Sequence, residues 1–192
     1  LSISIIKNLN IGFLINTILL TSAFYLFFIS LRDFYLNKFS KLSQSLAHFG
    51  FSIFILSVLL NNIFSTEVIT NLRVGETFKS EKFKINFVSI SQKDKQNFKS
   101  LTGKFNVENN NGIIETLNPE LRIYNQPNIV TSEADIKTNL LTDKFMTMNY
   151  VQNQDYFNVR YQNKPFMLWI WFSVSLISLG GLISLFYRKY EK

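Results

Sequence analysis

The sequence predicts a membrane protein of the α + β class, in which a small antiparallel β domain is inserted between the second and third of three transmembrane helices. Three runs contain no Asp, Glu, Lys or Arg, at residues 11–29, 46–64 and 166–186. Each is close to the roughly 20 residues that cross a hydrocarbon core of about 30 Å. Residues 65–165 have ordinary polarity and alternate apolar with polar side chains in places. We therefore divide the chain into residues 1–64, 65–165 and 166–192.

Basic residues gather in two short segments beside these runs. The loop at residues 30–45 carries Arg32, Lys38 and Lys41 with Asp33, and the tail after residue 186 carries Arg188, Lys189 and Lys192 with Glu191. By the positive-inside rule, both segments are expected on the cytoplasmic or matrix side of the membrane. The β domain is then expected in the periplasm of a bacterium or the intermembrane space of a mitochondrion.

Two features bear on the origin of the chain. The first run is interpreted as a membrane anchor rather than a signal peptide, because Thr21-Ser22-Ala23 is followed by further apolar aromatic residues. Alanine occurs only at positions 23, 47 and 134, whereas Asn, Lys, Ile and Phe are abundant, which is typical of a very AT-rich genome such as that of some mitochondria. The expected location is the mitochondrial inner membrane, or the bacterial inner membrane for a prokaryotic chain.

Composition excludes several classes of function. The chain has no cysteine, so disulfides, thiolate metal sites and a cysteine nucleophile are excluded. The net charge of +7 is mostly a topology signal, since the basic excess lies in the loop and the tail. No basic stripe alternates with stacking aromatic residues in the polar domain, which argues against nucleic-acid binding.

Period-two alternation predicts strands in the polar domain. Phe83, Ile85 and Phe87 alternate with polar residues, and so do Phe157, Val159 and Tyr161. Residues 104–108 and 113–117 are separated by Asn109-Asn110-Asn111-Gly112, whose Asn-Gly end suits a hairpin that needs positive φ. Asn118-Pro119 is expected to end the second strand, because proline has no N–H to donate.

Catalysis by the polar domain alone is not expected. It contains no histidine and no cysteine, so the usual general bases and thiol nucleophiles are absent. The carboxylates of Glu120, Glu133, Asp135 and Asp143 are interpreted as solvated charges rather than an acid/base pair. Met146 and Met148 are interpreted as core residues rather than as metal ligands.

His48 is the only histidine, and it lies in the second apolar run. An ionisable side chain inside a membrane span is a functional-site candidate, and neutral imidazole is a common ligand of haem iron. The alternative is a histidine that hydrogen-bonds a neighbouring helix. Ser45 and Ser52 lie three and four residues away on the same helical face, where a hydroxyl can orient the imidazole as a second-shell partner. Gly50 permits close approach of a macrocycle or of another helix.

Several motifs follow one another in a characteristic order. They are His48-Phe49-Gly50, then Arg73 and Gly75, Asn118-Pro119-Glu120-Leu121-Arg122-Ile123-Tyr124, Glu133-Ala134-x-Ile136, Thr142-Asp143-Lys144-Phe145, Arg160-Tyr161-x-x-Lys164-Pro165-Phe166-x-x-Trp169-Ile170-Trp171, and Gly180-Gly181 before a basic tail. In this order and spacing they resemble the C-terminal part of the CcmF family, the haem lyases of cytochrome c maturation. Phe49 replaces the leucine of the family's His-Leu-Gly, and Leu121 replaces a lysine of its Pro-Glu-Lys-Arg-x-Tyr element.

This resemblance implies that His48 is an axial ligand of a haem b that is shared with another chain. It further implies that the complete enzyme attaches haem to the thiols of a CxxCH motif in an apocytochrome c, with the haem b as reductant. The chain lacks the family's tryptophan-rich segment, the two histidines that flank it and the other transmembrane histidine. It is therefore expected to be a non-autonomous fragment of a haem lyase, whose partners are other CcmF fragments, apocytochrome c and a haem chaperone.

Two other functions remain open from the sequence. A CcmF-derived chain could serve as a structural subunit of an inner-membrane respiratory assembly, without lyase activity. An unrelated membrane-anchored β domain that binds protein partners is the third interpretation. A companion chain bearing the missing tryptophan-rich segment would favour the haem lyase.

Overall fold

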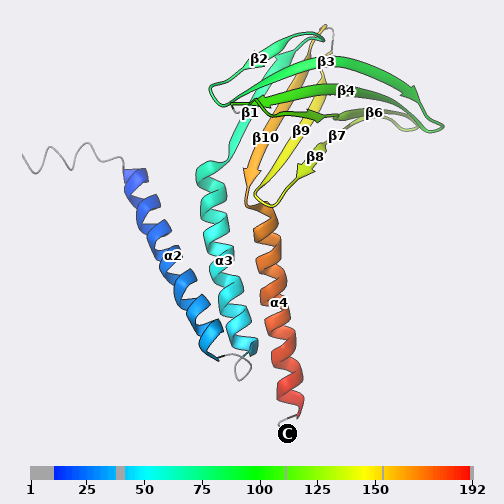
Figure 1. Ribbon diagram of the computed structural model, residues 1–192. Coiled ribbons are helices and arrows are strands. Elements are labelled where there is room, and N and C mark those ends of the chain that lie inside the picture. Colours follow the sequence, from blue (N-terminus) through cyan, green and yellow to red (C-terminus); the bar gives the residue numbers. More distant parts are fainter. Residues whose placement is uncertain (1–10, 38–41, 111, 153, 191–192) are drawn as a thin grey trace, which may run out of the picture. The chain divides into compact units, whose positions relative to one another are not determined.

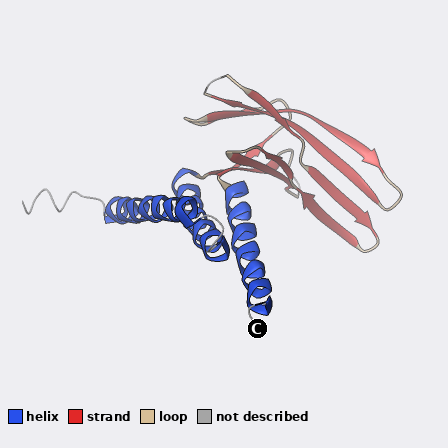
Figure 2. Cartoon of the chain, turned by 60° about the horizontal axis from the view of Figure 1, so that its bottom comes forward, coloured by secondary structure: helices blue, strands red, loops and turns tan. Residues whose placement is uncertain are grey.

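The computed structural model describes residues 11–37, 42–110, 112–152 and 154–190 (Figure 1). The chain forms two compact units. The first unit contains the helices and comprises Leu1–Phe64, Leu140–Thr142 and Pro165–Lys192, and the second comprises Ser65–Asn139 and Asp143–Lys164. Helices and strands are thus segregated along the chain, and the predicted α + β membrane class is confirmed. Figure 2 colours the helices blue and the strands red.

Three helices make up most of the first unit. They are α2 (Ile11–Asn37), α3 (Leu42–Phe64) and α4 (Met167–Tyr190). Each contains a stretch that is long and apolar enough to cross a membrane, at Leu14–Leu36, Leu42–Phe64 and Met167–Phe186.

The helices are longer than the charge-free runs from which they were predicted. Helix α2 continues through Arg32 and Asp33, and α3 begins four residues before residue 46, so most of the expected loop at residues 30–45 is helical. The reason is that backbone hydrogen bonding does not stop where a span reaches the charged interface. Lys38 and Lys41 of the predicted basic loop, and Glu191 and Lys192 of the tail, lie outside the described residues.

Small residues bring α3 and α4 into close contact. A Cβ atom placed on Gly50 would lie 3.0 Å from the carbonyl oxygen of Ser173, and one placed on Gly180 would lie 2.8 Å from the carbonyl oxygen of Ser43. Small residues in such positions allow helix backbones to approach each other within a membrane. Helix α2 contacts α3 differently, because Phe49 packs against Phe27 and Phe34 with ring centroids 5.7 Å apart in each pair.

Ten strands form two antiparallel sheets in the second unit. The strands are β1 (Thr66–Leu72), β2 (Thr77–Lys79), β3 (Phe83–Asp94), β4 (Phe98–Asn109), β5 (Ile114–Leu117), β6 (Glu120–Asn125), β7 (Asn128–Glu133), β8 (Asp135–Thr138), β9 (Thr142–Tyr150) and β10 (Phe157–Pro165). One sheet has the order β1-β10-β9-β8, and the other has the order β2-β3-β4-β6-β7 with β5 also paired to β4.

The predicted hairpin is confirmed, but its first strand, β4, also pairs with β3 along one edge and with β6. Glu108 of β4 pairs with Ile114 of β5, and Gly112 in the turn has φ 74°. Strand β5 ends at Leu117, before Asn118-Pro119, as expected. The first half of β4 instead pairs with β6, with Phe98 opposite Tyr124.

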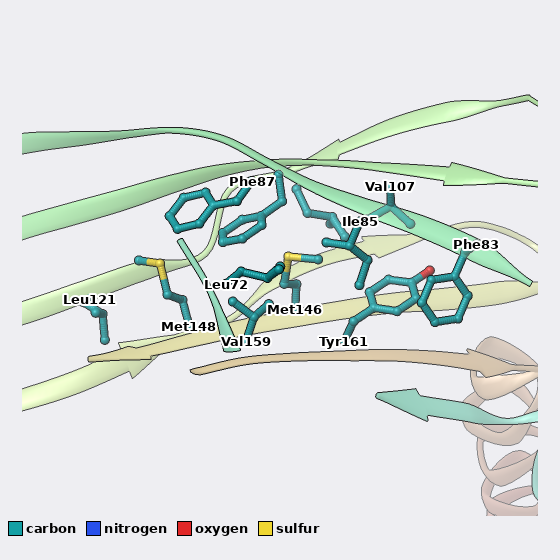
Figure 3. Close-up of a cluster of buried hydrophobic side chains, with 12 residues drawn as sticks. Leu72, Phe83, Ile85, Phe87, Val107, Leu121, Met146, Met148, Val159 and Tyr161 are labelled. Atoms are coloured by element: carbon teal, nitrogen blue, oxygen red, sulfur yellow. The ribbon is translucent and has the colours of Figure 1, made fainter. Parts of the chain in front are cut away.

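The core lies between the two sheets and makes the second unit a β-sandwich (Figure 3). The alternating residues Phe83, Ile85 and Phe87 are all buried, and the Phe87 ring stacks on Phe105 with centroids 4.2 Å apart. The ring of Tyr161 from the other sheet meets Phe83 at 5.0 Å, and burial raises the pKa of this phenol to about 12. Met146 and Met148 are fully buried in this core, which confirms their predicted packing role.

Candidate functional site

His48 lies on a side of α3 that no described element of the helical unit covers. It follows Leu42 by six residues, which corresponds to about 9 Å along the axis of an α-helix. The imidazole is exposed, and so are Gln44, Phe51, Val58 and Asn62 at helical spacing above and below it. We call these five residues the open face of α3.

The packing of the residues next to His48 explains why the His48 side chain is exposed. Successive residues of an α-helix point about 100° apart. Phe49 is held by the two phenyl rings of α2, and Gly50 lies against the backbone of α4. Helix α3 is therefore packed on two sides, and the direction that remains is the one His48 takes.

The two serines predicted to accompany His48 are placed differently from it. Ser45 is only 4% exposed and Ser52 is fully buried, whereas the imidazole is exposed. The Ser52 hydroxyl donates a 2.7 Å hydrogen bond to the carbonyl oxygen of Phe49. Its oxygen retains acceptor capacity, so the predicted second-shell role of Ser45 and Ser52 stays a prediction.

Three of the four candidate carboxylates, those of Glu120, Glu133 and Asp135, contact a cation or a backbone group. Arg122 lies 3.2 Å from a Glu120 carboxylate oxygen and 3.7 Å from one of Glu133. Hydrogen bonds from Arg122 and Ser100 hold the pKa of Glu120 below its ordinary value. Asp135 accepts a 2.6 Å hydrogen bond from the Asn118 backbone N–H. These contacts are structural, and the lowered pKa of Glu120 favours its ionised form, unlike the raised pKa of a poised general acid.

No metal cluster is found within the described ranges of the chain, where no three His, Cys, Asp or Glu side chains converge. A pocket of about 430 Å³ in the sandwich is lined by Leu101, Leu121, Ile123, Val130, Ser132, Asn149, Tyr150 and Gln152. Its lining carries neither a carboxylate nor an imidazole, so its chemistry suits binding of an apolar group rather than catalysis.

Sequence reasoning missed two features of the helical unit. The open face of α3 follows from helical spacing, but the spacing alone does not say which face a neighbour covers. The turn between β8 and β9 belongs to the helical unit, since the Trp169 indole donates a 2.8 Å hydrogen bond to the Leu140 carbonyl. The sequence signal that could have indicated this attachment was a pair of leucines, Leu140 and Leu141, at a turn between two polar strands.

The fold defines a membrane protein with a β-sandwich inserted between its second and third candidate spans, and with one exposed histidine on the second span. Residues 63–165 match the family described as the CcmF C-terminal beta-sandwich. The chain therefore belongs to the CcmF family of cytochrome c-type biogenesis proteins, as its motifs indicated.

The sequences of several relatives align with most of this chain. The cytochrome c-type biogenesis protein ccl1 of Rhodobacter capsulatus is 31% identical over 148 residues, which cover 77% of this chain and 23% of the relative. CcmF of Pseudomonas aeruginosa is 27% identical over 148 residues, covering 77% of this chain and 22% of the relative. A solved structure of the cytochrome c heme lyase CcmF shares the fold with a TM-score of 0.55 at 16% identity, over 73% of this chain and 23% of that one.

Proposed function

We propose that this chain is a non-autonomous subunit of a membrane haem lyase for c-type cytochromes, to which it contributes one axial ligand of a haem b. The observation that carries the proposal is the outward imidazole of His48 on the open face of α3. The chain spans about a quarter of the length of the relatives it matches, so the lyase activity of a whole relative is part of this proposal.

The open face fits one side of a haem. An ionisable residue inside a span is costly unless it faces a partner or a ligand. Neutral imidazole offers one nitrogen lone pair to iron, and Phe51, one turn further along the exposed side, offers an apolar surface for a macrocycle. These 192 residues contain one histidine, so a second axial histidine would have to come from outside them.

When bound there, haem b would supply a reductant that keeps the iron of the incoming haem ferrous. The role of this chain would be to bind the haem iron through His48. The hydroxyl of Ser45 or Ser52 would accept a hydrogen bond from the imidazole N–H and so orient the ring. The expected partners are CcmF fragments with the tryptophan-rich segment, apocytochrome c and a haem chaperone. The expected place is the mitochondrial inner membrane, or the bacterial one, with the β-sandwich as a docking domain in the intermembrane space or periplasm.

The test compares two variants of the assembled complex, purified through a tag on this chain. His48→Ala is expected to remove the low-spin haem b spectrum and cytochrome c maturation while the subunit still inserts. Gln44→Ala changes the same open face without removing an imidazole, and it should keep both. The chain purified alone in detergent should lack a bis-histidine spectrum.

Retention of full haem b by the His48→Ala complex would refute the ligand assignment. If, in addition, respiratory subunits and no tryptophan-rich CcmF fragment copurify with the chain, the structural-subunit function replaces the lyase function. Stoichiometric low-spin haem in the isolated chain would contradict the requirement for a companion.

A further inference from the structure

The turn between β8 and β9 contains two exposed leucines. Leu140 is 70% exposed and Leu141 is 61% exposed, and no charged side chain lies between Thr138 and Thr142. Both belong to the helical unit rather than to the sandwich. Figure 1 shows this turn beside the start of α4.

Two hydrogen bonds fix the turn to the start of α4. The Trp169 indole N–H donates to the Leu140 carbonyl at 2.8 Å, and the backbone N–H of Phe166 donates to the Leu141 carbonyl at 2.8 Å. Phe166 itself has φ 61°, an unusual conformation for a residue other than glycine, which its contact with the turn helps to hold.

These bonds determine the depth of the turn. Trp169 is in the first turn of α4, within the candidate span Met167–Phe186. The Asn61 side chain, near the end of α3, donates a 2.5 Å hydrogen bond to the Pro165 carbonyl, so the two spans meet at this level. A group bonded to the first turn of a span lies at the depth of that turn, which is where indoles favour the headgroup region.

The backbone carbonyls of the turn have hydrogen-bond partners within the protein, as a water-poor environment requires. A carbonyl group that enters hydrocarbon needs a partner within the protein, and the carbonyls of Leu140 and Leu141 both have one. Leu141 also lines an apolar pocket of about 290 Å³ with Phe166, Trp169 and Phe172, together with side chains of α2 and α3. The leucine surface is therefore continuous with the apolar surface of the spans.

We propose that Leu140 and Leu141 insert into the bilayer leaflet in which α4 begins, at the boundary between headgroups and acyl chains. The turn thus acts as a third point of attachment to the membrane, besides the two covalent connections through α3 and α4. This inference rests on the membrane spans and does not depend on the haem assignment.

The absence of cysteine makes a direct test available, since Leu140→Cys creates a single thiol in the full chain. A nitroxide on this thiol, in phosphatidylcholine vesicles, is probed with oxygen, which concentrates among acyl chains, and with a nickel chelate, which stays in water. Leu168→Cys, on α4, serves as the membrane control. Gln96→Cys, in the exposed turn between β3 and β4, serves as the water control. Leu141→Cys provides a second position in case Leu140→Cys misfolds.

We expect the ratio of oxygen to nickel accessibility at Leu140 or Leu141 to match the membrane control and to exceed the water control several-fold. A ratio equal to that of Gln96→Cys overturns the proposal. Low accessibility to both reagents also overturns it, because the leucines would then be covered by protein instead of lipid.

Discussion

The hydroxyl of Ser43 donates a 2.8 Å hydrogen bond to the carbonyl oxygen of Gly180, which joins α3 to α4 across 137 positions of sequence. This bond requires the two backbones to be nearly in contact. A Cβ atom on Gly180 would meet the Ser43 carbonyl oxygen at 2.8 Å and the Ala47 backbone nitrogen at 3.0 Å. Neither atom belongs to a flexible side chain, so the helices themselves would have to move.

Gly180→Ala is therefore expected to destabilise the helical unit by about 1–3 kcal/mol, the usual cost of overpacking. Gly181 is a matched control, because a Cβ atom there has nothing within 4 Å. Thermal unfolding of the detergent-purified protein should show a lower midpoint for Gly180→Ala alone. Equal midpoints for the two variants would show that this close approach is not needed.

Met148→Ala is expected to destabilise the β-sandwich by about 2–5 kcal/mol, because the truncated side chain leaves a cavity in a closed core. Met148 is fully buried, whereas the next residue, Asn149, is exposed on the other side of β9. Chemical denaturation should show little effect of Asn149→Ala. A loss of haem from a stable Met148→Ala complex would contradict its assignment to the core.

The ion pair between Glu120 and Arg122 predicts a dependence of stability on pH. Hydrogen bonds from Arg122 and Ser100 lower the pKa of Glu120 from its ordinary value of 4.5. A carboxylate with a lowered folded-state pKa stabilises the fold above its ordinary pKa, and this contribution is lost as the pH falls through the folded-state value. Glu120→Gln should thus cost about 1 kcal/mol at pH 7 and much less in strong acid.

The control for this pH dependence is Glu108→Gln. Glu108 pairs with Lys84 at 3.3 Å, but their side chains are 38% and 51% exposed, and such surface pairs contribute little. Denaturation midpoints measured across the acid range should separate the two variants. A pH-independent difference between Glu120→Gln and the parent protein would contradict the electrostatic explanation.

The basic tail predicts that the β-sandwich lies on the outer side of the membrane. In intact mitoplasts or spheroplasts, a membrane-impermeant maleimide should label Gln96→Cys at once. Lys189→Cys should react only after the membrane has been permeabilised. The reverse order of labelling would show that the orientation is inverted.

Sequence patterns predicted the strands and spans that depend only on residues close together in the chain. Phe83, Ile85 and Phe87 point inward because alternate residues of a strand share a face, and the spans follow from the absence of charge. Contacts between distant segments were beyond this reasoning. The division of β4 between β5 and β6 depends on a three-strand arrangement, and the bond from Trp169 to Leu140 joins a helix to a turn 29 residues earlier.

For the candidate site as well, the sequence predicted the residue but not its surroundings. The type and position of His48 made it a candidate, because a lone imidazole in an apolar span is unusual. Its outward direction was not predictable, since it depends on α2 and α4 occupying the other sides of α3. For the same reason, the burial of Ser45 and Ser52 could not be inferred from their helical spacing.

The first and last strands of the β-sandwich are neighbours, with Thr66 of β1 opposite Asn163 of β10. The chain consequently leaves α3 and returns to α4 through adjacent backbones, about 4.8 Å apart in a sheet. A domain whose two ends coincide in this way is a cassette: it can be acquired, lost or exchanged during evolution without altering the separation of the helices that flank it.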